Sequence, residues 1–151
     1  IVGGGPLEQE LHDLAKKLGL KNVIFTGMIS EEEKVKHIEK CDFLVLPSIS
    51  KAEAFALVQI EAMAFGKPVI NTALPSGVPC VSINGVTGLT VQPGSLSELT
   101  HAMDKMAEND TMREKYGRQA FDMVKREYTP EKLAERHMQV FRELLNEGKV
   151  K

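Results

Sequence analysis

Short, nearly continuous apolar runs constrain the fold of this chain more than any other feature. The runs at 42–47, 68–71 and 88–91 are bounded by glycine, proline or polar residues. Runs without polar alternation are typical of parallel strands that are buried on both faces. Between the runs, apolar residues recur at helical spacing. The pattern predicts an α/β fold, a three-layer, Rossmann-like, doubly wound parallel sheet with helices on both faces.

The first forty residues are predicted to form two strand–helix units. Residues 1–2 would end a buried strand, and residues 22–27 would form a second short strand. Leucines at helical spacing between them predict a helix that opens at Pro6 and ends at Gly19. Ser30 and Glu33 match a capping box, which predicts another helix through about Lys40.

The remaining elements follow from the same kinds of signal. A helix is expected after Glu53, ending at Gly66, and the segment 72–88 is expected to be loops with one short element. A second capping box at Ser95 and Glu98 opens a helix. Two more helices are predicted near 111–126 and 130–147, the last with an apolar stripe of Leu133, Val140, Phe141 and Leu144.

Two carboxylates eight positions apart, Glu53 and Glu61, are the main candidates for a functional role. Glu53 lies in the loop after the strand at 42–47, and Glu61 is expected a little over two turns inside the following helix. A strand, a loop and a helix N-terminus together form a phosphate-binding geometry. Carboxylates on either side could hold hydroxyl groups, which points to a nucleotide-sugar. On spacing alone, carboxylates of an amphipathic helix are more often solvated.

Composition excludes several classes of protein. The 151 residues suit one domain or a piece of a larger one, and the net charge of −2 without a long basic run argues against nucleic acid as the main partner. No apolar run approaches the roughly 20 residues that span a bilayer. Cys41 and Cys80 lack metal-ligand spacing and suit a reduced compartment, so we expect a cytoplasmic protein. The four histidines have no well-placed partner, and we expect no metal.

An ordered set of short motifs resembles the C-terminal, donor-binding half of a retaining glycosyltransferase of the GT-B fold, glycosyltransferase family 4. The motifs also resemble bacterial enzymes that build surface polysaccharides, often mannosyltransferases. The matching segments are Val2-Gly3-Gly4-Gly5-Pro6, Val23 to Gly27, Leu46-Pro47-Ser48, Glu53 to Ile70, and Thr87 to Pro93.

The resemblance implies a role for each matching residue. Glu53 corresponds to the acid beside the donor sugar, near the reacting centre, and Glu61 to the acid that holds the ribose. The other donor-binding positions are the backbone amides of Phe55, Ala56 and Leu57 for the diphosphate, Gly3 and Gly5 for close backbone approach, and Gly27 and Met28 for the base. The implied donor is GDP-mannose or a UDP-sugar, and no cofactor or metal is implied because the helix dipole and basic side chains would stabilise the leaving diphosphate.

Two departures from the family pattern affect these expectations. The family usually has glycine at the position of Ala56, where a methyl group would crowd the phosphate or shift the loop. The Arg and Lys that clamp the diphosphate normally come from a strand upstream of Ile1. We therefore expect residues 1–151 to be one nucleotide-sugar-binding domain that lacks its first strand and the N-terminal acceptor domain, and to be inactive alone.

Partners and rival functions follow from the same resemblance. The acceptor would be a glycan or a lipid-linked glycan held by the N-terminal domain, and the whole protein could associate peripherally with the cytoplasmic face of the inner membrane. One rival is a GT-B-like sugar-nucleotide epimerase, for which we find no catalytic carboxylate and histidine set. A second rival is a non-catalytic Rossmann-like binding module. Lys51 and Ser48 stay open as phosphate or substrate contacts or as ordinary loop residues.

Overall fold

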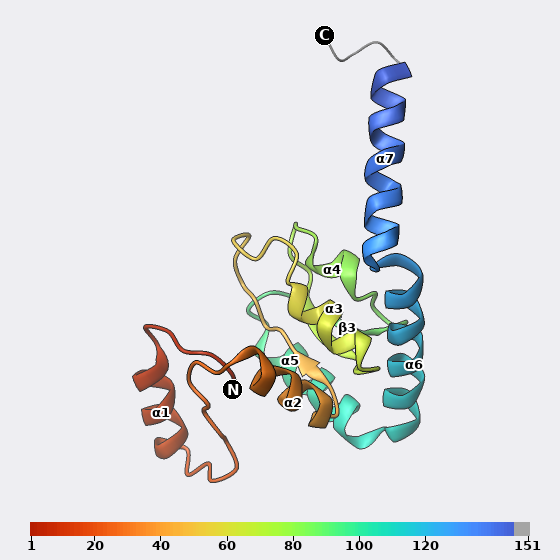
Figure 1. Cartoon of the computed structure of the whole chain (residues 1–151). Coiled ribbons are helices and arrows are strands. Elements are labelled where there is room, and N and C mark those ends of the chain that lie inside the picture. Colours follow the sequence, from red (N-terminus) through yellow and green to blue (C-terminus); the bar gives the residue numbers. More distant parts are fainter. Residues whose placement is uncertain (147–151) are drawn as a thin grey trace. The chain divides into compact units, whose positions relative to one another are not determined.

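The computed structural model describes residues 1–146 of the chain. The chain divides into two compact units, Ile1–Lys40 and Cys41–Lys151 (Figure 1). Residue 147, the expected end of the last helix, lies outside the described residues.

The first unit contains two helices, α1 (Glu8–Lys17) and α2 (Glu31–Lys40). Gly19 has a φ of +68°, a left-handed conformation that favours glycine, and α1 ends before it as predicted. Pro6 precedes α1 by two residues and does not open it. The capping box of α2 is confirmed, because Glu33 N–H donates to Ser30 Oγ (3.2 Å) and Ser30 N–H donates to Glu33 Oε2 (2.9 Å).

The predicted strands at 1–2 and 22–27 are wrong. The two segments do exchange backbone hydrogen bonds, from Thr26 N–H to Ile1 O and from Gly3 N–H to Gly27 O, both 3.0 Å. These bonds form only an isolated bridge between Gly3 and Gly27. Ile1 and Ile24 are 61% and 73% exposed, so apolar packing does not support the pair. Two paired segments without a packed face are too few to make a stable sheet.

The second unit contains a parallel sheet of three strands, in the order β1-β2-β3. The strands are β1 (Leu44–Val45), β2 (Val69–Thr72) and β3 (Gly88–Val91). Val45 pairs with Ile70, and Ile70 pairs with Leu89. The predictions for β2 and β3 are confirmed. The predicted strand at 42–47 is shorter than expected, because the chain leaves the ladder after Leu46 N–H bonds to Ile70 O (2.8 Å).

Helices cover both faces of this sheet. On one face, Ile70 packs with Met106 of α5 (Leu96–Glu108) and Tyr116 of α6 (Asp110–Glu127). On the other face, Asn71 is hydrogen-bonded to α3 (Leu57–Ala64) and to the carbonyl of Val78 in α4 (Val78–Val81). Successive residues of β2 thus point into different helical layers. The expected three-layer α/β fold is confirmed.

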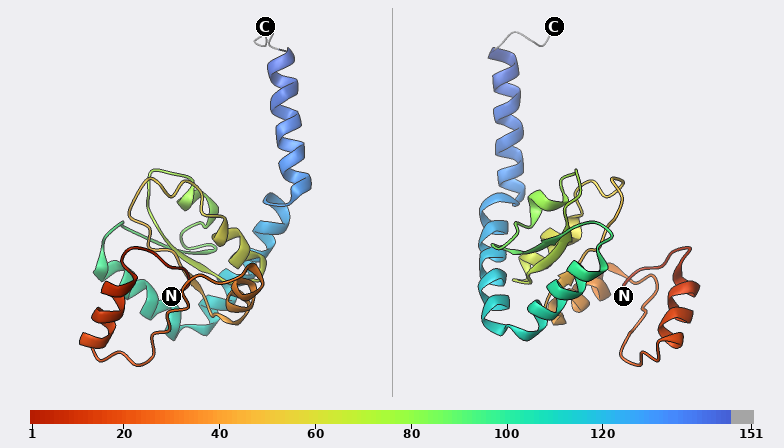
Figure 2. Two further views of the ribbon diagram at one scale, coloured as in Figure 1. Left: turned by 60° about the vertical axis from the view of Figure 1, so that its left-hand side comes forward. Right: turned by 180° about the vertical axis from the view of Figure 1, so that it is seen from behind.

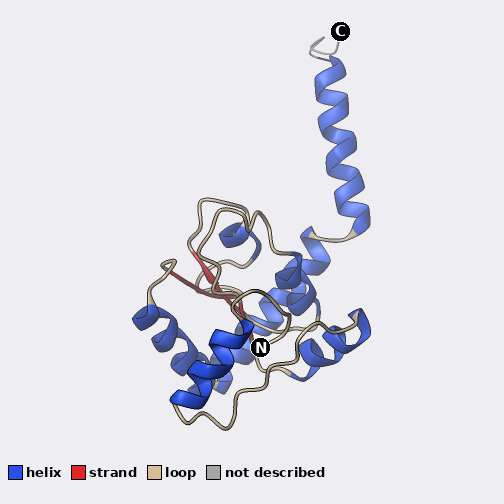
Figure 3. Cartoon of the chain, turned by 90° about the vertical axis from the view of Figure 1, so that its left-hand side faces the viewer, coloured by secondary structure: helices blue, strands red, loops and turns tan. Residues whose placement is uncertain are grey.

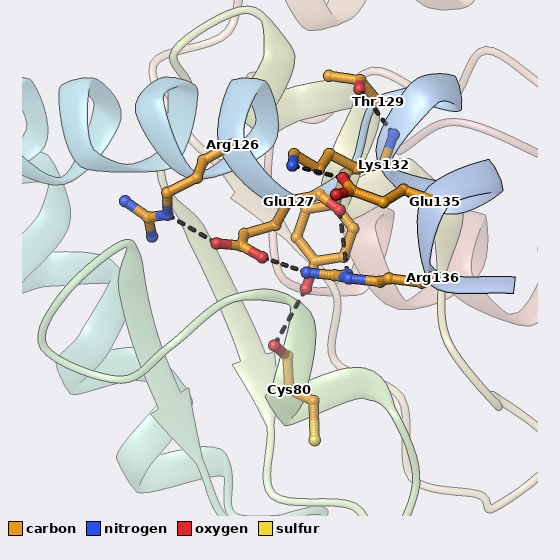
Figure 4. Close-up of polar contacts among 8 residues, drawn as sticks. Cys80, Arg126, Glu127, Thr129, Lys132, Glu135 and Arg136 are labelled. Atoms are coloured by element: carbon orange, nitrogen blue, oxygen red, sulfur yellow. Dashed lines mark hydrogen bonds and ion pairs between the residues drawn. The ribbon is translucent and has the colours of Figure 1, made fainter. Parts of the chain in front are cut away.

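The last helix, α7 (Pro130–Asn146), follows α6 and has no buried residue. In both views of Figure 2 it extends away from the strands. A cluster of polar contacts forms the corner between the two helices (Figure 4). Glu127 accepts hydrogen bonds from Arg126 Nε (2.7 Å) and from Arg136, and Arg136 Nη1 donates to Glu127 O (3.2 Å). The hydroxyl of Tyr128 donates to Cys80 O (3.3 Å), which connects this corner to α4.

Candidate functional site

The candidate site lies where the parallel strands end. The carboxyl ends of β1, β2 and β3 share one edge of the sheet, which is where ligands bind in open α/β sheets. Figure 3 shows long loops (tan) connecting the strands (red) to the helices. The loop that leaves β1 at this edge contains Glu53 and enters α3. Thr72, the last residue of β2, donates its hydroxyl hydrogen to Ser48 O (2.6 Å). The loop is therefore fixed to the end of β2 through the carbonyl of Ser48.

The start of α3 differs from the sequence expectation. The helix begins at Leu57, so Glu61 is its fifth residue and lies just over one turn inside it, not over two turns. The cause is Ala56, which has φ 60° and ψ 75° in the left-handed region. Within residues 1–146 it is the only non-glycine residue with a positive φ. This conformation costs an alanine roughly 1–2 kcal/mol and stops the helix from extending toward Glu53.

Ala56 and Leu57 together form an anion-binding geometry. A left-handed residue followed by a helical one turns successive N–H groups toward one concave side, an arrangement called a nest. The structure records no acceptor among residues 1–146 for the N–H groups of Phe55, Ala56 or Leu57. The N-terminal end of α3 adds its positive dipole at this point. The arrangement can hold a phosphate group or another anion without a metal.

The two carboxylates lie on either side of this nest along the chain. Glu53 is half-buried, and its N–H donates to Ser50 O (3.1 Å), so a turn at Ser50 holds the loop before α3. Ala52 N–H donates to Ser50 Oγ (3.2 Å) and strengthens the same turn. Glu61 is half-buried on α3, one turn after Leu57. Lys51 is exposed in this loop.

Sequence reasoning missed Gln59, which lies between the two carboxylates in the sequence and is fully buried. Its side-chain amide nitrogen donates to Phe55 O (3.3 Å) and to Val78 O (3.2 Å), and its oxygen accepts from Asn71 Nδ2 (2.9 Å). Asn71 in turn accepts a hydrogen bond from the Thr90 hydroxyl (2.7 Å). The signal was present, because Gln59 shares a helical face with the apolar Ala62 and Met63.

The other predicted donor-binding residues belong to the first unit. Gly3 and Gly27 have φ values of +99° and +63°, and the hydrogen bond from Gly3 N–H to Gly27 O (3.0 Å) brings the two glycine segments together. Gly5 has no positive φ, and a Cβ built there would meet no atom within 4 Å. Met28 is 84% exposed. The two glycine segments therefore meet through their backbones, and the exposed Met28 side chain follows Gly27 directly in the chain.

The described part of the chain contains neither a candidate metal cluster nor a membrane-spanning helix. No cluster of three or more His, Cys, Asp or Glu side chains that could hold a metal ion occurs among residues 1–146. None of the helices in that range is both long and apolar enough to cross a bilayer.

The fold, and the position of the site at the carboxyl ends of the strands, define a class of protein. This class is the Rossmann-like C-terminal half of GT-B glycosyltransferases. The chain is similar to the crystal structure of Anabaena Alr3699/HepE in complex with UDP-glucose, with a TM-score of 0.81 and 25% identity. That match covers 95% of this chain and 40% of the other. Sucrose-phosphate synthase from Thermosynechococcus elongatus also matches, with a TM-score of 0.81 and 28% identity, over 96% of this chain and 38% of that one.

Residues 1–123 match the family described as Glycosyl transferases group 1, and the chain belongs to this family. It is 30% identical over 145 residues to O-antigen chain mannosyltransferase C of Escherichia coli, covering 96% of this chain and 39% of the relative. It is 38% identical over 120 residues to D-rhamnosyltransferase WbpZ of Pseudomonas aeruginosa, covering 80% of this chain and 32% of the relative. The chain thus spans only 32% to 39% of the length of these two curated relatives. The epimerase alternative is not favoured.

Proposed function

We propose that this chain is the donor-binding part of a retaining glycosyltransferase of family 4 and that it binds GDP-mannose or a UDP-sugar. The observation that carries the proposal is the nest at the start of α3, with its N–H groups available and a half-buried carboxylate on either side along the chain. Relatives named as a mannosyltransferase and a rhamnosyltransferase support it, as does the neighbour crystallised with UDP-glucose.

Each part of the site binds a different part of the nucleotide-sugar donor. The N–H groups of Phe55, Ala56 and Leu57 hold the diphosphate, because a dianionic group gains most from several aligned donors at a helix N-terminus. Glu61 accepts hydrogen bonds from the ribose hydroxyls. Glu53 lies beside the sugar, near the anomeric carbon. The family resemblance also assigns donor contacts to four residues of the first unit, Gly3, Gly5, Gly27 and Met28.

The proposed reaction is sugar transfer with retention of configuration. The bond between the anomeric carbon and the diphosphate breaks, and a bond to an acceptor hydroxyl forms on the same face of the sugar. The nucleoside diphosphate leaves and takes up the proton of the acceptor hydroxyl, with its charge stabilised by the α3 N-terminus and without a metal or other cofactor. The acceptor is a glycan or a lipid-linked glycan of polysaccharide biosynthesis on the cytoplasmic side of the membrane.

Transfer itself is proposed to need more than this chain. The chain spans 39% of the mannosyltransferase relative. The remaining part of such relatives would supply the acceptor site and the basic residues that clamp the diphosphate. We therefore expect donor binding by this chain and no detectable transfer by it alone. Turnover of a UDP-sugar or GDP-mannose by residues 1–151 would contradict that expectation.

The test is an NMR titration of ¹⁵N-labelled protein with GDP, UDP and ADP. The proposal predicts binding of one nucleotide in preference to the others, with shifts at the backbone amides of Phe55, Ala56 and Leu57. Preference for GDP would favour a mannose-type donor. The rival reading as a non-catalytic module predicts no binding of any of the three.

A pair of variants sharpens this test. Glu61→Ala removes acceptors for the ribose, and hydrogen bonds to a charged group are worth about 1.5–3 kcal/mol each, so Kd should rise tenfold or more. Glu108→Ala, at the last residue of α5, removes a carboxylate outside the site and should leave Kd unchanged. Equal affinity of the Glu61→Ala variant and the wild type would count against the proposed ribose contact.

A further inference from the structure

We infer that Gln59 is a positioning residue, which aims the diphosphate-binding N–H groups of the nest from inside the protein core. The inference rests on the proposed function, since it concerns how that site is held in shape. Gln59 itself is 0% exposed and cannot touch a ligand. It acts through the backbone of Phe55 and Ala56, which precede α3, and of Leu57, the first residue of the helix.

The argument depends on the geometry of a trans peptide, in which the C=O and the following N–H point in opposite directions. No cis peptide occurs among residues 1–146. The side-chain amide of Gln59 donates to Phe55 O (3.3 Å), and the backbone N–H of Gln59 donates to Ala56 O (3.0 Å). Both carbonyls are therefore held toward the core. The N–H groups on the same two peptides, those of Ala56 and Leu57, are held toward the opposite side.

A third carbonyl is fixed in the same way by a different residue. Gly77 N–H donates to Ala54 O (2.7 Å), which orients the N–H of Phe55. The three carbonyls of Ala54, Phe55 and Ala56 are thus all bonded, while the three N–H groups of the following residues stay available. These are the three N–H groups that the family resemblance assigns to the diphosphate.

The strain at Ala56 explains why such support is needed. A left-handed alanine returns to a commoner conformation unless its neighbours prevent it. Gln59 bonds to the carbonyls on both sides of the Ala56 α-carbon. It is in turn held by Asn71 of β2 and by Val78 O of α4. Hydrogen bonds through Gln59 therefore connect the nest to β2 and to α4, so α3 alone does not determine its geometry.

The purely structural alternative makes a different prediction. If Gln59 only satisfies buried polar groups, every member of this buried network should affect binding in proportion to its effect on stability. Ser82 offers the comparison. It is 1% exposed, and its hydroxyl bonds to the Thr87 hydroxyl (3.0 Å) and not to any residue of the nest.

The test compares nucleoside diphosphate binding by Gln59→Leu, Gln59→Glu and the control Ser82→Ala, each checked for folding by circular dichroism. The nucleotide is the one that the wild-type chain prefers. Gln59→Leu removes the donor to Phe55 O and should raise Kd tenfold or more, with a shifted Ala56 amide resonance in the free protein. Ser82→Ala should change Kd less than twofold at a comparable loss of stability.

Gln59→Glu adds a second measurement, the pH dependence of nucleotide binding, which a packing role of Gln59 would not change. An ionised carboxylate repels the carbonyls of Phe55 and Val78, whereas a protonated one can donate to one of them. Burial raises the pKa of such a carboxyl group above that of an exposed glutamate. The ratio of variant to wild-type Kd should therefore fall as the pH is lowered from 8 to 5. A ratio that does not change with pH would overturn the inference.

A second variant keeps the test decisive if Gln59→Leu does not fold. Gly77 has φ −70° and ψ −11°, which alanine adopts readily, but a Cβ there would lie 2.8 Å from the Phe55 ring and 2.9 Å from Ala54 O. Gly77→Ala should displace the Ala54–Phe55 peptide and also weaken binding at least tenfold. Folded variants that bind like the wild type would overturn the inference. Absence of binding by the wild type would instead contradict the proposed function.

Discussion

The two faces of β2 differ in what they bury. Ile70 faces an apolar cluster with Val91, Met106 and Tyr116, where only shape and area matter. Asn71, the next residue, faces hydrogen-bonding partners on α3, α4 and β3 and is 1% exposed. Apolar burial is not directional, whereas hydrogen bonds fix orientation. One face therefore stabilises the unit, and the other determines where the loop before α3 points.

The largest expected effect is on the apolar face. Ile70→Ala should lower the free energy of unfolding by about 2–5 kcal/mol, because it removes a fully buried side chain and leaves a cavity. Chemical denaturation measures this loss. At temperatures where the variant is folded, the nucleotide Kd should match that of the wild type. A changed Kd would show that the two faces are not separate in function.

The polar face should respond in both stability and binding. Asn71→Leu keeps the branched shape and the number of side-chain heavy atoms but removes the donor to Gln59 Oε1 and to the carbonyls of Val78 and Ser82. Buried groups left without a partner cost about 1–3 kcal/mol, so denaturation should show a loss of that order. Nucleotide affinity should also fall, since Gln59 loses its partner. Unchanged affinity would contradict the proposed division between the faces.

Ala56→Gly tests the strain at the site directly. Glycine adopts the left-handed conformation without steric cost, and its greater freedom in the unfolded chain offsets part of that gain, so stability should rise by about 1 kcal/mol or less. The matched control is Ala64→Gly, in the last helical position of α3, which should lower stability by about 0.5–1 kcal/mol. Thermal unfolding of both variants shows whether each substitution raises or lowers the stability. A loss of stability in both would mean that Ala56 is not strained.

The smallest effect concerns the corner between α6 and α7, which lies outside both faces. The hydrogen bond from Arg126, together with Arg136, lowers the pKa of Glu127 below its ordinary value of 4.5. A lowered pKa means that the carboxylate stabilises the corner above pH 4.5 and loses this effect as the pH falls through its own pKa. The NMR resonances of the Arg136 guanidinium should move over that acid range. In Glu127→Gln that movement should be absent.

Much of the second unit could be predicted from the sequence. The runs at β2 and β3 are apolar and short, and their ends are marked by Pro68, Gly88 and Pro93, so their bounds were nearly right. The cap of α5 was also predicted, although only half of its box forms. Glu98 N–H lies 3.4 Å from Ser95 Oγ, but the Glu98 carboxylate accepts from Gln92 N–H (2.8 Å) in place of Ser95.

The errors have specific physical causes. Apolar composition predicted strands at 1–2 and 22–27, but strand formation depends on neighbours that local sequence does not report. The start of α3 was misplaced because alanine favours helices. The glycine that the family usually has at position 56 was the one signal that this residue is left-handed. Gln59 was overlooked because a polar residue in a helix is usually exposed. Its partners, Asn71 and Val78, come from segments that only folding brings together.

The contact between Phe55 and Tyr128 gives the protein an optical probe of its own. The two rings meet edge to face with centroids 6.4 Å apart, so a residue of the loop before α3 lies beside the corner of α6 and α7. The chain has no tryptophan and only two tyrosines, and the other, Tyr116, lies in the apolar cluster. In a Tyr116→Phe chain, Tyr128 would be the sole tyrosine emitter. Its fluorescence would then report the motion of the loop without any attached dye.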